Sequence, residues 1–185
     1  MLRVIAGTAK GRRLKSVPGA GTRPALAQVR AAVFNIAQSY VPGSRFLDLF
    51  AGTGAYAIEA LSRGAATATL VELNPEAIAV IRHNLRICGF EEHSTVIHAD
   101  VLRAVERLSR QGDRFDIIMV APPYFHGLGP RTVEKLAALG LLEPGGLCFM
   151  QHSAKEQVRA ESGDLAVVRS YSYGSNMLSL YRHKA

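Results

Sequence analysis

The sequence predicts an α/β fold built on a doubly wound, mostly parallel sheet of seven strands. Short apolar runs alternate with segments of helical spacing from residue 45 to residue 151, and two more apolar runs near the C-terminus flank Gly174-Ser175. Alternating strands and helices are typical of a parallel sheet with right-handed crossovers and helices on both faces. The Gly-Ser pair indicates a hairpin, so we expect the sheet to end in an antiparallel pair.

The N-terminal quarter has a different pattern. The runs LRVIA and RRLKSV lie on either side of GTAKG and predict a short β-hairpin. A loop over 18–24 leads to a helix over 25–39, where apolar residues recur at helical spacing, and Pro42-Gly43 closes the segment. We therefore expect an N-terminal extension over residues 1–42 and a main domain over residues 43–185.

In the main domain, the apolar runs are the expected strands and the amphipathic stretches between them are the expected helices. The strands cover 45–50, 67–73, 94–99, 115–121, 146–151, 165–173 and 176–182. The helices cover 54–63, 75–88, 101–110 and 131–140, and Gly89 ends the second of them. Open sheets of this kind bind ligands outside the carboxyl ends of their strands, so that edge is where a site is expected.

The chain of 185 residues has a net charge of +7, and the whole excess lies in its first quarter. Residues 1–47 hold eight Lys and Arg and no acidic residue, whereas residues 48–185 hold 14 basic and 15 acidic residues. A concentrated positive segment attracts polyanions, although a solvated face that only aids solubility is the alternative. The basic residues that we assign to an RNA contact are Lys10, Arg12, Arg13, Arg23 and Arg30.

Composition excludes several classes of protein. Hydrophobic residues make up 48% and charged residues 20%, which suits a packed core and argues against disorder. Cys88 and Cys148 lie too far apart for a CxxC metal site, and the six histidines show no metal-ligand spacing. No apolar run is long enough for a signal peptide or a membrane span. We therefore expect a cytoplasmic protein without a metal, and a monomer, because nothing demands an oligomer.

A glycine-rich turn follows the first strand of the main domain. Its glycines let a ligand approach the backbone and put N–H groups at the start of a helix. Glu72 ends the next strand, where a carboxylate can bind both hydroxyls of a ribose, and Asp100 follows the third strand, within reach of an adenine edge. These features favour a cofactor that contains a ribose and an adenine. The residues expected to bind it are Asp48, Phe50, Ala51, Gly52, Thr53, Gly54, Glu72 and Asp100.

The turn also fits the GxGxxG/A fingerprint of dinucleotide-binding proteins, which makes an NAD-dependent oxidoreductase an alternative. However, Asp48 lies before the turn, at the end of the strand. A carboxylate there would repel a pyrophosphate, whereas it can accept a hydrogen bond from an ammonium group. S-Adenosyl-L-methionine carries an ammonium group and no phosphate, so electrostatics favours this cofactor over NAD.

The fourth strand ends in Val120-Ala121-Pro122-Pro123-Tyr124. This segment resembles the [Asp/Asn]-Pro-Pro-[Tyr/Phe] tetrapeptide of methyltransferases that act on exocyclic amino groups. The resemblance implies that backbone carbonyls bind the amine and that the aromatic ring stacks on the base. It assigns catalysis to Ala121, Pro122, Pro123 and Tyr124. Because Ala121 stands where the motif has a side-chain acceptor, the alternative is a weakened or non-catalytic relative that binds cofactor and RNA.

With both motifs placed, the chain resembles the RsmD type of bacterial 16S rRNA guanine-N2 methyltransferase over essentially its full length. The most specific stretch is LDLFAGTGAYAIEALSRGA over residues 47–65, and RVIAGTAKGRRL, Asn84-Leu85 and Pro122-Pro123-Tyr124 add to it. The resemblance implies a Rossmann-like class I methyltransferase that uses S-adenosylmethionine to methylate the 2-amino group of a guanine. It implies 16S rRNA or an assembled small ribosomal subunit as the partner.

Overall fold

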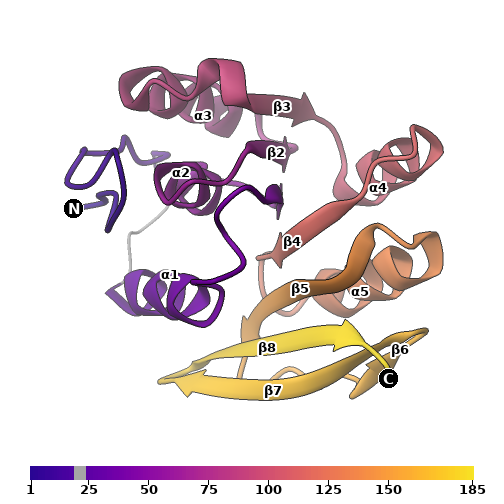
Figure 1. Cartoon of the computed structure of the whole chain (residues 1–185). Coiled ribbons are helices and arrows are strands. Elements are labelled where there is room, and N and C mark those ends of the chain that lie inside the picture. The colour runs from indigo at the N-terminus through magenta and orange to yellow at the C-terminus, as the bar shows by residue number, and fades with distance from the viewer. Residues whose placement is uncertain (19–23) are drawn as a thin grey trace.

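The computed structural model describes residues 1–18 and 24–185, so Arg23 and most of the loop expected over 18–24 lie outside the described residues (Figure 1). The helices are α1 (Pro24–Ile36), α2 (Ala55–Ser62), α3 (Pro75–Cys88), α4 (Val101–Arg110) and α5 (Leu128–Leu139), with a 3-10 turn η1 (Glu91–His93). The strands are β1 (Arg45–Leu49), β2 (Thr67–Glu72), β3 (Ser94–His98), β4 (Phe115–Val120), β5 (Leu142–Ser153), β6 (Glu161–Ser162), β7 (Leu165–Tyr173) and β8 (Asn176–His183).

Within the described residues, all strands belong to one sheet in the order β3-β2-β1-β4-β5-β8-β7-β6. The first five are parallel, and β8, β7 and β6 extend the sheet in antiparallel fashion. This confirms the doubly wound parallel sheet and its antiparallel C-terminal pair. The sheet has eight strands where we expected seven, because the two-residue β6 pairs with the edge of β7 and is too short to give a sequence pattern.

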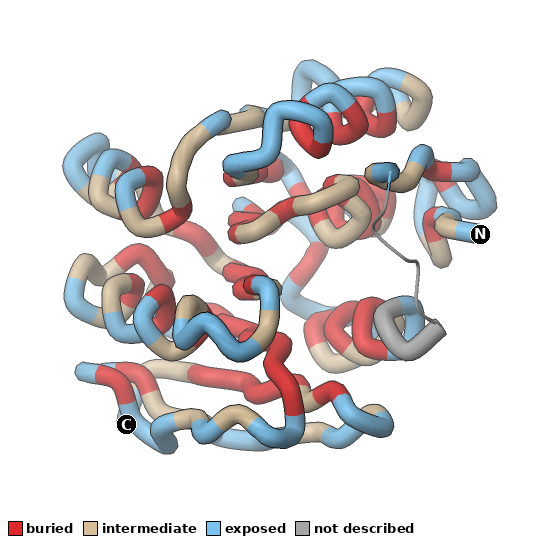
Figure 2. The backbone as a smooth tube through the Cα atoms, turned by 180° about the vertical axis from the view of Figure 1, so that it is seen from behind, coloured by how far each residue is buried: buried red, intermediate tan, exposed pale blue. Residues whose placement is uncertain are grey.

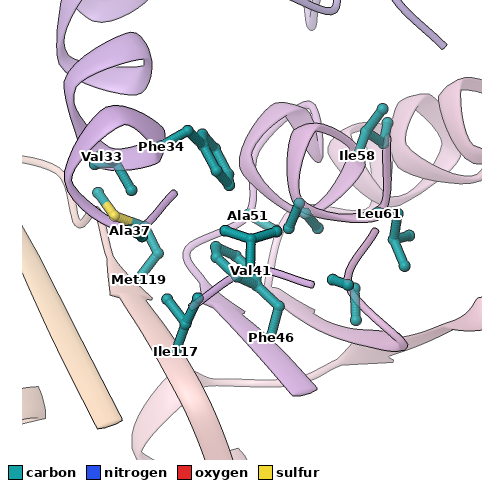
Figure 3. Close-up of a cluster of buried hydrophobic side chains, with 14 of the residues drawn as sticks. Val33, Phe34, Ala37, Val41, Phe46, Ala51, Ile58, Leu61, Ile117 and Met119 are labelled. Carbon is teal, nitrogen blue, oxygen red and sulfur yellow. The ribbon is translucent and has the colours of Figure 1, made fainter. Parts of the chain in front are cut away.

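Helices cover both faces of the sheet (Figure 1). Alternate residues of each strand point to opposite sides, so each strand contributes to the apolar core on both faces. Phe46 and Ile117 belong to the core shared with α1, α2 and α3, whereas Leu47 and Ile118 belong to the core shared with α4 and α5. Figure 3 shows part of the first core, in which the rings of Phe34 and Phe46 stack with centroids 6.0 Å apart. The buried residues in Figure 2 follow the central strands and the inward faces of the helices.

Three element boundaries differ from expectation by three or more residues. Helix α1 ends at Ile36 rather than at residue 39. Helix α5 begins three residues early, because Gly127 adopts a left-handed conformation (φ 63°) directly before Leu128. Strand β5 begins four residues early, and its pairing with β4 shifts register between Phe115 and Ile117. None of the described helices is both long enough and apolar enough to span a membrane.

The N-terminal segment has the antiparallel pairing of the predicted hairpin, but no regular strands. An isolated bridge joins Arg3 to Arg13, the Val4 N–H donates to the Arg12 carbonyl at 3.1 Å, and the Leu14 N–H donates to the Leu2 carbonyl at 3.0 Å. The segment also bonds to α2. The buried carboxylate of Glu59 accepts hydrogen bonds from the N–H groups of Ile5 (2.8 Å) and Ala6 (2.9 Å). The Ser62 hydroxyl accepts one from the N–H of Ala9 at 2.9 Å. The segment is therefore fixed both by pairing between its two arms and by long-range contacts with α2.

Gly7 explains how closely the segment approaches α2. Its φ is +82°, and a Cβ added there would lie 1.7 Å from the Ser62 carbonyl oxygen. Gly11 has the same φ, but a Cβ there would meet nothing within 4 Å. A side chain at either glycine would strain the left-handed backbone, but only a side chain at Gly7 would also clash with α2.

We expect Gly7→Ala to destabilise the protein much more than Gly11→Ala. Both variants carry the left-handed cost of about 1–2 kcal/mol, and only Gly7→Ala adds an overpacking cost of about 1–3 kcal/mol. Free energies of unfolding from urea titrations measure the difference. Equal losses in the free energy of unfolding would show that the N-terminal segment does not pack closely against α2 at Gly7.

Candidate active site

The residues expected to form a site follow neighbouring strands at one edge of the sheet. Leu49 of β1 pairs with Val71 of β2 and with Val120 of β4, and all three strands are parallel. Their carboxyl ends therefore lead to the glycine-rich turn, to Glu72 and to the Pro-Pro-Tyr segment side by side. Asp100 follows β3, the next strand outward, and caps α4 by accepting a hydrogen bond from the Arg103 N–H at 3.2 Å.

The turn over residues 50–54 has an unusual backbone that three side chains hold in place. Phe50, Gly52 and Gly54 are left-handed, with φ of 64°, 57° and 75°. Glu72 Oε2 accepts a hydrogen bond from the Gly52 N–H at 2.8 Å, and Asn84 Nδ2 donates one to the Thr53 carbonyl at 2.9 Å. Asp48 holds the start of α2 through the Ala57 N–H at 3.1 Å. The turn is therefore fixed from β1, β2 and α3 together.

Glu72 is a half-buried carboxylate with its own position fixed. Besides Gly52, it accepts hydrogen bonds from the N–H groups of Leu73 (2.8 Å) and Asn74 (2.9 Å), both through Oε1. A carboxylate offers about four acceptor positions, so Glu72 keeps capacity for a hydroxyl group. It lies at the carboxyl end of β2, at the edge where open α/β sheets bind ligands.

Asp48 is fully buried, and one of its oxygens has no hydrogen-bond partner in the described part of the chain. Oδ2 accepts from the Ala57 N–H, whereas Oδ1 accepts from none of the described residues. Burial raises the pKa of Asp48 well above its usual value, the Ala57 N–H lowers it, and the charge of Glu72 raises it further. A buried acceptor without a partner is costly, and a ligand ammonium group would satisfy it. The residues present thus fit a cofactor with an amine and a ribose.

The Pro-Pro-Tyr segment forms the other side of this edge. The Ala121 N–H donates to the Leu49 carbonyl at 3.3 Å, which ties the segment to β1. Tyr124 lies half-buried, and its hydroxyl donates to Asn176 Oδ1 at 2.6 Å and accepts from Gln151 Nε2 at 2.7 Å. Gln151 Oε1 in turn accepts from the Tyr56 hydroxyl at 2.9 Å. Sequence reasoning missed Tyr56, Gln151 and Asn176, and only Tyr56 carried a signal, because it lies in the family stretch 47–65.

Phe125 continues the segment in a strained conformation. Its φ is 66°, and 66% of the residue is exposed. Glu156 holds it by accepting hydrogen bonds from the N–H groups of Phe125 (2.9 Å) and Ser153 (2.9 Å). Among the described non-glycine residues, only Phe50 and Phe125 have positive φ, and they follow the adjacent strands β1 and β4. Backbone strain therefore gathers at the carboxyl edge, as it does at functional sites.

The basic residues of the extension occupy different environments. Lys10, Arg12 and Arg13 are exposed, which suits contact with a large polyanion. Arg30 is only 4% exposed, and its Nη2 donates to the Arg3 carbonyl at 2.6 Å. Burial lowers the pKa of Arg30, and the nearby Glu59 raises it. The structure thus gives Arg30 a contact inside the fold, and its expected contact with RNA stays a prediction.

Known proteins resemble the whole chain. A family model described as conserved hypothetical protein 95 matches residues 2–182. A Bacillus subtilis protein named “Putative rRNA methyltransferase YlbH” is 33% identical over 183 residues, covering 99% of this chain and 100% of that protein. Ribosomal RNA small subunit methyltransferase D of Escherichia coli K12 is 29% identical over 184 residues, covering 100% and 91%. The solved structure of a hypothetical protein from Thermus thermophilus has a TM-score of 0.85 and 33% identity, covering 98% and 99%.

We expect Asp48→Asn to stabilise the protein at neutral pH and to weaken binding of S-adenosylhomocysteine. The raised pKa of Asp48 means that the folded chain loses stability as pH rises from the ordinary value of 3.8 toward the pKa in the fold. The amide carries no charge, so the variant gains most over the wild type at neutral pH and the gain shrinks toward pH 4. Urea unfolding from pH 4 to pH 8 and calorimetry measure both effects. A variant that is less stable at every pH would contradict this account.

Proposed function

Because the chain belongs to the RsmD-type family of rRNA methyltransferases, we propose that it transfers a methyl group from S-adenosylmethionine to a guanine of 16S rRNA. The proposed acceptor is the exocyclic N2 amine of that guanine. The observation that carries the proposal is the buried Asp48 with an acceptor that lacks a partner among the described residues, next to a fixed glycine-rich turn and the Pro-Pro-Tyr segment. This edge combines a place for a cationic amino-acid moiety with a place for a flat base.

On the cofactor side, S-adenosylmethionine supplies the sulfonium methyl group when bound. Asp48 Oδ1 would accept a hydrogen bond from its ammonium group, and Glu72 would bind the ribose hydroxyls. Asp100 would lie near the adenine edge, and the glycines of the turn let the backbone approach closely. The turn is already held by Glu72 and Asn84, so binding requires little reordering of this part of the chain.

On the target side, the Pro-Pro-Tyr segment would orient the amine. The carbonyls of Ala121 and Pro122 would accept its hydrogens, and the Tyr124 ring would stack on the guanine. Accepting both hydrogens directs the nitrogen lone pair toward the methyl group, so the reaction is an in-line displacement that depends on positioning. The N–C bond would form as the sulfonium C–S bond breaks, with S-adenosylhomocysteine as the leaving group and one amine proton released to water. Because Ala121 has no side-chain oxygen, the carbonyls and the ring carry this task without a further acceptor at that position.

The N-terminal extension supplies the contact with RNA in this proposal. Residues 1–42 would bind the phosphate backbone through the exposed Lys10, Arg12 and Arg13, and residues 43–185 would hold the cofactor. The extension is anchored to α2 through Glu59 and Ser62, and α2 begins at the cofactor turn. RNA held by the extension would therefore be held in a fixed relation to the cofactor.

Methyl transfer to small ribosomal subunits tests the proposal directly. We expect the purified chain to incorporate labelled methyl groups into 30S particles from a strain that lacks the modification. Mass spectrometry of the nucleosides should identify N2-methylguanosine. If the chain binds S-adenosylhomocysteine and yet transfers no methyl group to particles or to free 16S rRNA, the proposed function is wrong.

Ala121 favours one alternative, a relative that binds cofactor and RNA with little or no catalysis. We expect Ala121→Asp to raise the rate of transfer, because a single positioned hydrogen-bonding group contributes about 10²–10³-fold. Ala121→Leu adds similar bulk without an acceptor and is the matched control, which we expect to be slower than the wild type. A wild-type rate of zero together with activity in Ala121→Asp would favour the non-catalytic relative.

Charge reversal in the extension tests the RNA contact. We expect the double variant Arg12→Glu/Arg13→Glu to bind RNA more weakly and with a flatter salt dependence, because fewer phosphates are neutralised. Its affinity for S-adenosylhomocysteine should stay unchanged. The control is Arg103→Glu/Arg107→Glu, which makes the same charge change on exposed residues of α4. Equal losses in the two double variants would mean that net charge, and not the extension, governs binding.

A further inference from the structure

Four side chains form a hydrogen-bonded chain that includes the tyrosine of the Pro-Pro-Tyr segment. Their order is Tyr56, Gln151, Tyr124 and Asn176. The Tyr56 hydroxyl donates to Gln151 Oε1 (2.9 Å), and Gln151 Nε2 donates to the Tyr124 hydroxyl (2.7 Å). The Tyr124 hydroxyl then donates to Asn176 Oδ1 (2.6 Å). All three hydrogen bonds run in the same direction, from Tyr56 toward Asn176, so each donor has an acceptor.

The four residues come from separate parts of the fold. Tyr56 lies in the first turn of α2, two residues after the cofactor turn, and Gln151 lies near the end of β5. Asn176 begins β8, and it pairs with Ser153 of β5 across the antiparallel part of the sheet. The antiparallel strands thus contribute to the edge at which the parallel strands form the site.

In this hydrogen-bonded chain, Gln151 and Asn176 are buried and the two tyrosines are half-buried, so an unpaired polar group would be costly. Gln151 is 4% exposed and Asn176 is 6% exposed, and burial raises the pKa of Tyr56. Removing one partner would leave another polar group buried without a hydrogen bond. A network of this kind specifies one arrangement of its members, since alternative rotamers break a link.

Tyr124 gains a fixed orientation from this arrangement. Its ring is attached to the backbone at one end and held at its hydroxyl by two partners at the other. The next residue, Phe125, is held in a left-handed conformation by Glu156, so the backbone beside Tyr124 is fixed as well. A ring held at both ends presents one face for stacking without a rotameric search.

We infer that Tyr56, Gln151 and Asn176 are positioning residues that hold the Tyr124 ring in place for the target guanine. The inference rests on the proposed function and adds the residues that set base orientation in it. Because Ala121 contributes no side-chain acceptor, the position of the amine depends more strongly on the ring than it would beside an Asp or Asn. A shift of the base of about 1 Å costs about 10²-fold in rate.

Variants of Gln151 and Asn176 test the inference in the full chain. We expect Gln151→Leu and Asn176→Leu to lower kcat for 30S particles by about 10²-fold. The KM for the particle and the affinity for S-adenosylhomocysteine should stay within about twofold, since neither the extension nor the cofactor turn changes. Asn176→Asp keeps an acceptor for the Tyr124 hydroxyl and should retain most of the activity. Loss of cofactor affinity in proportion to kcat would overturn the inference in favour of a general structural role.

A double-mutant cycle identifies the path of the effect. Tyr124→Phe keeps the ring and removes the hydroxyl, so Gln151→Leu should lower kcat little further in that background. Multiplicative losses would overturn the inference. Thr132→Val is the control for removing a buried hydrogen bond, because the Thr132 hydroxyl donates to the Leu128 carbonyl in α5 at 2.7 Å. Its kcat should match that of the wild type.

The same variants separate this inference from the proposed function. If the wild-type chain transfers no methyl group, the proposed function fails. The coupling between Gln151 and Tyr124 is then measured from the free energies of unfolding of the single and double variants. Non-additive changes would support the hydrogen-bonded chain, and additive changes would overturn it.

Discussion

The left-handed turn between β1 and α2 is the constraint on which the rest of the structure depends. Its conformation favours glycine at Gly54, where φ is 75° and a Cβ would lie 3.2 Å from Leu70 Cδ2, and it is held by Glu72 and Asn84. The Asn84 amide also accepts from the Lys15 N–H (2.8 Å) and donates to the Lys15 carbonyl (3.0 Å). One buried side chain therefore joins the glycine-rich turn to the N-terminal extension, and α2 joins them a second time through Glu59.

The carboxyl edge concentrates costs that the two apolar cores offset. Asp48 is a buried carboxylate with one oxygen that lacks a partner among the described residues, and Phe50 and Phe125 have left-handed backbones. Each of these features destabilises the fold by about 1–3 kcal/mol. The residues that form cores on both faces of the sheet lie behind this edge and keep it in place. These features lower the stability of the folded protein at the edge where a ligand could bind, and a bound ligand would stabilise the folded state.

The periodicity of the sequence predicts the parallel part of the fold well, because each strand and helix there has a local signal. The pattern also predicts the pairing of the two N-terminal arms, but not the contacts that hold them on α2, because Glu59 and Ser62 lie more than 50 positions away from their partners in the sequence. Arg30 looked like a surface cation, but it lies beside Val29 and four residues before Phe34 on the buried face of α1. The helical spacing from Phe34 predicts a buried position for Arg30, whereas the net charge of the segment favours an exposed one.

The candidate site is predictable only in part for the same reason. Carboxylates at strand ends follow from strand order, so Asp48 and Glu72 could be named in advance. Gln151 and Asn176 could not, because they lie 27 and 52 positions from Tyr124 and belong to no local pattern. They come to lie beside the Pro-Pro-Tyr segment only because the antiparallel strands place them there.

A crystal structure of the chain with S-adenosylhomocysteine tests the central claim most directly. The account predicts density along the carboxyl edge, with the amine within hydrogen-bond distance of Asp48 Oδ1 and a ribose hydroxyl at Glu72. Saturating ligand that leaves this edge empty, or that binds elsewhere while Asp48 Oδ1 stays without a partner, would contradict the account.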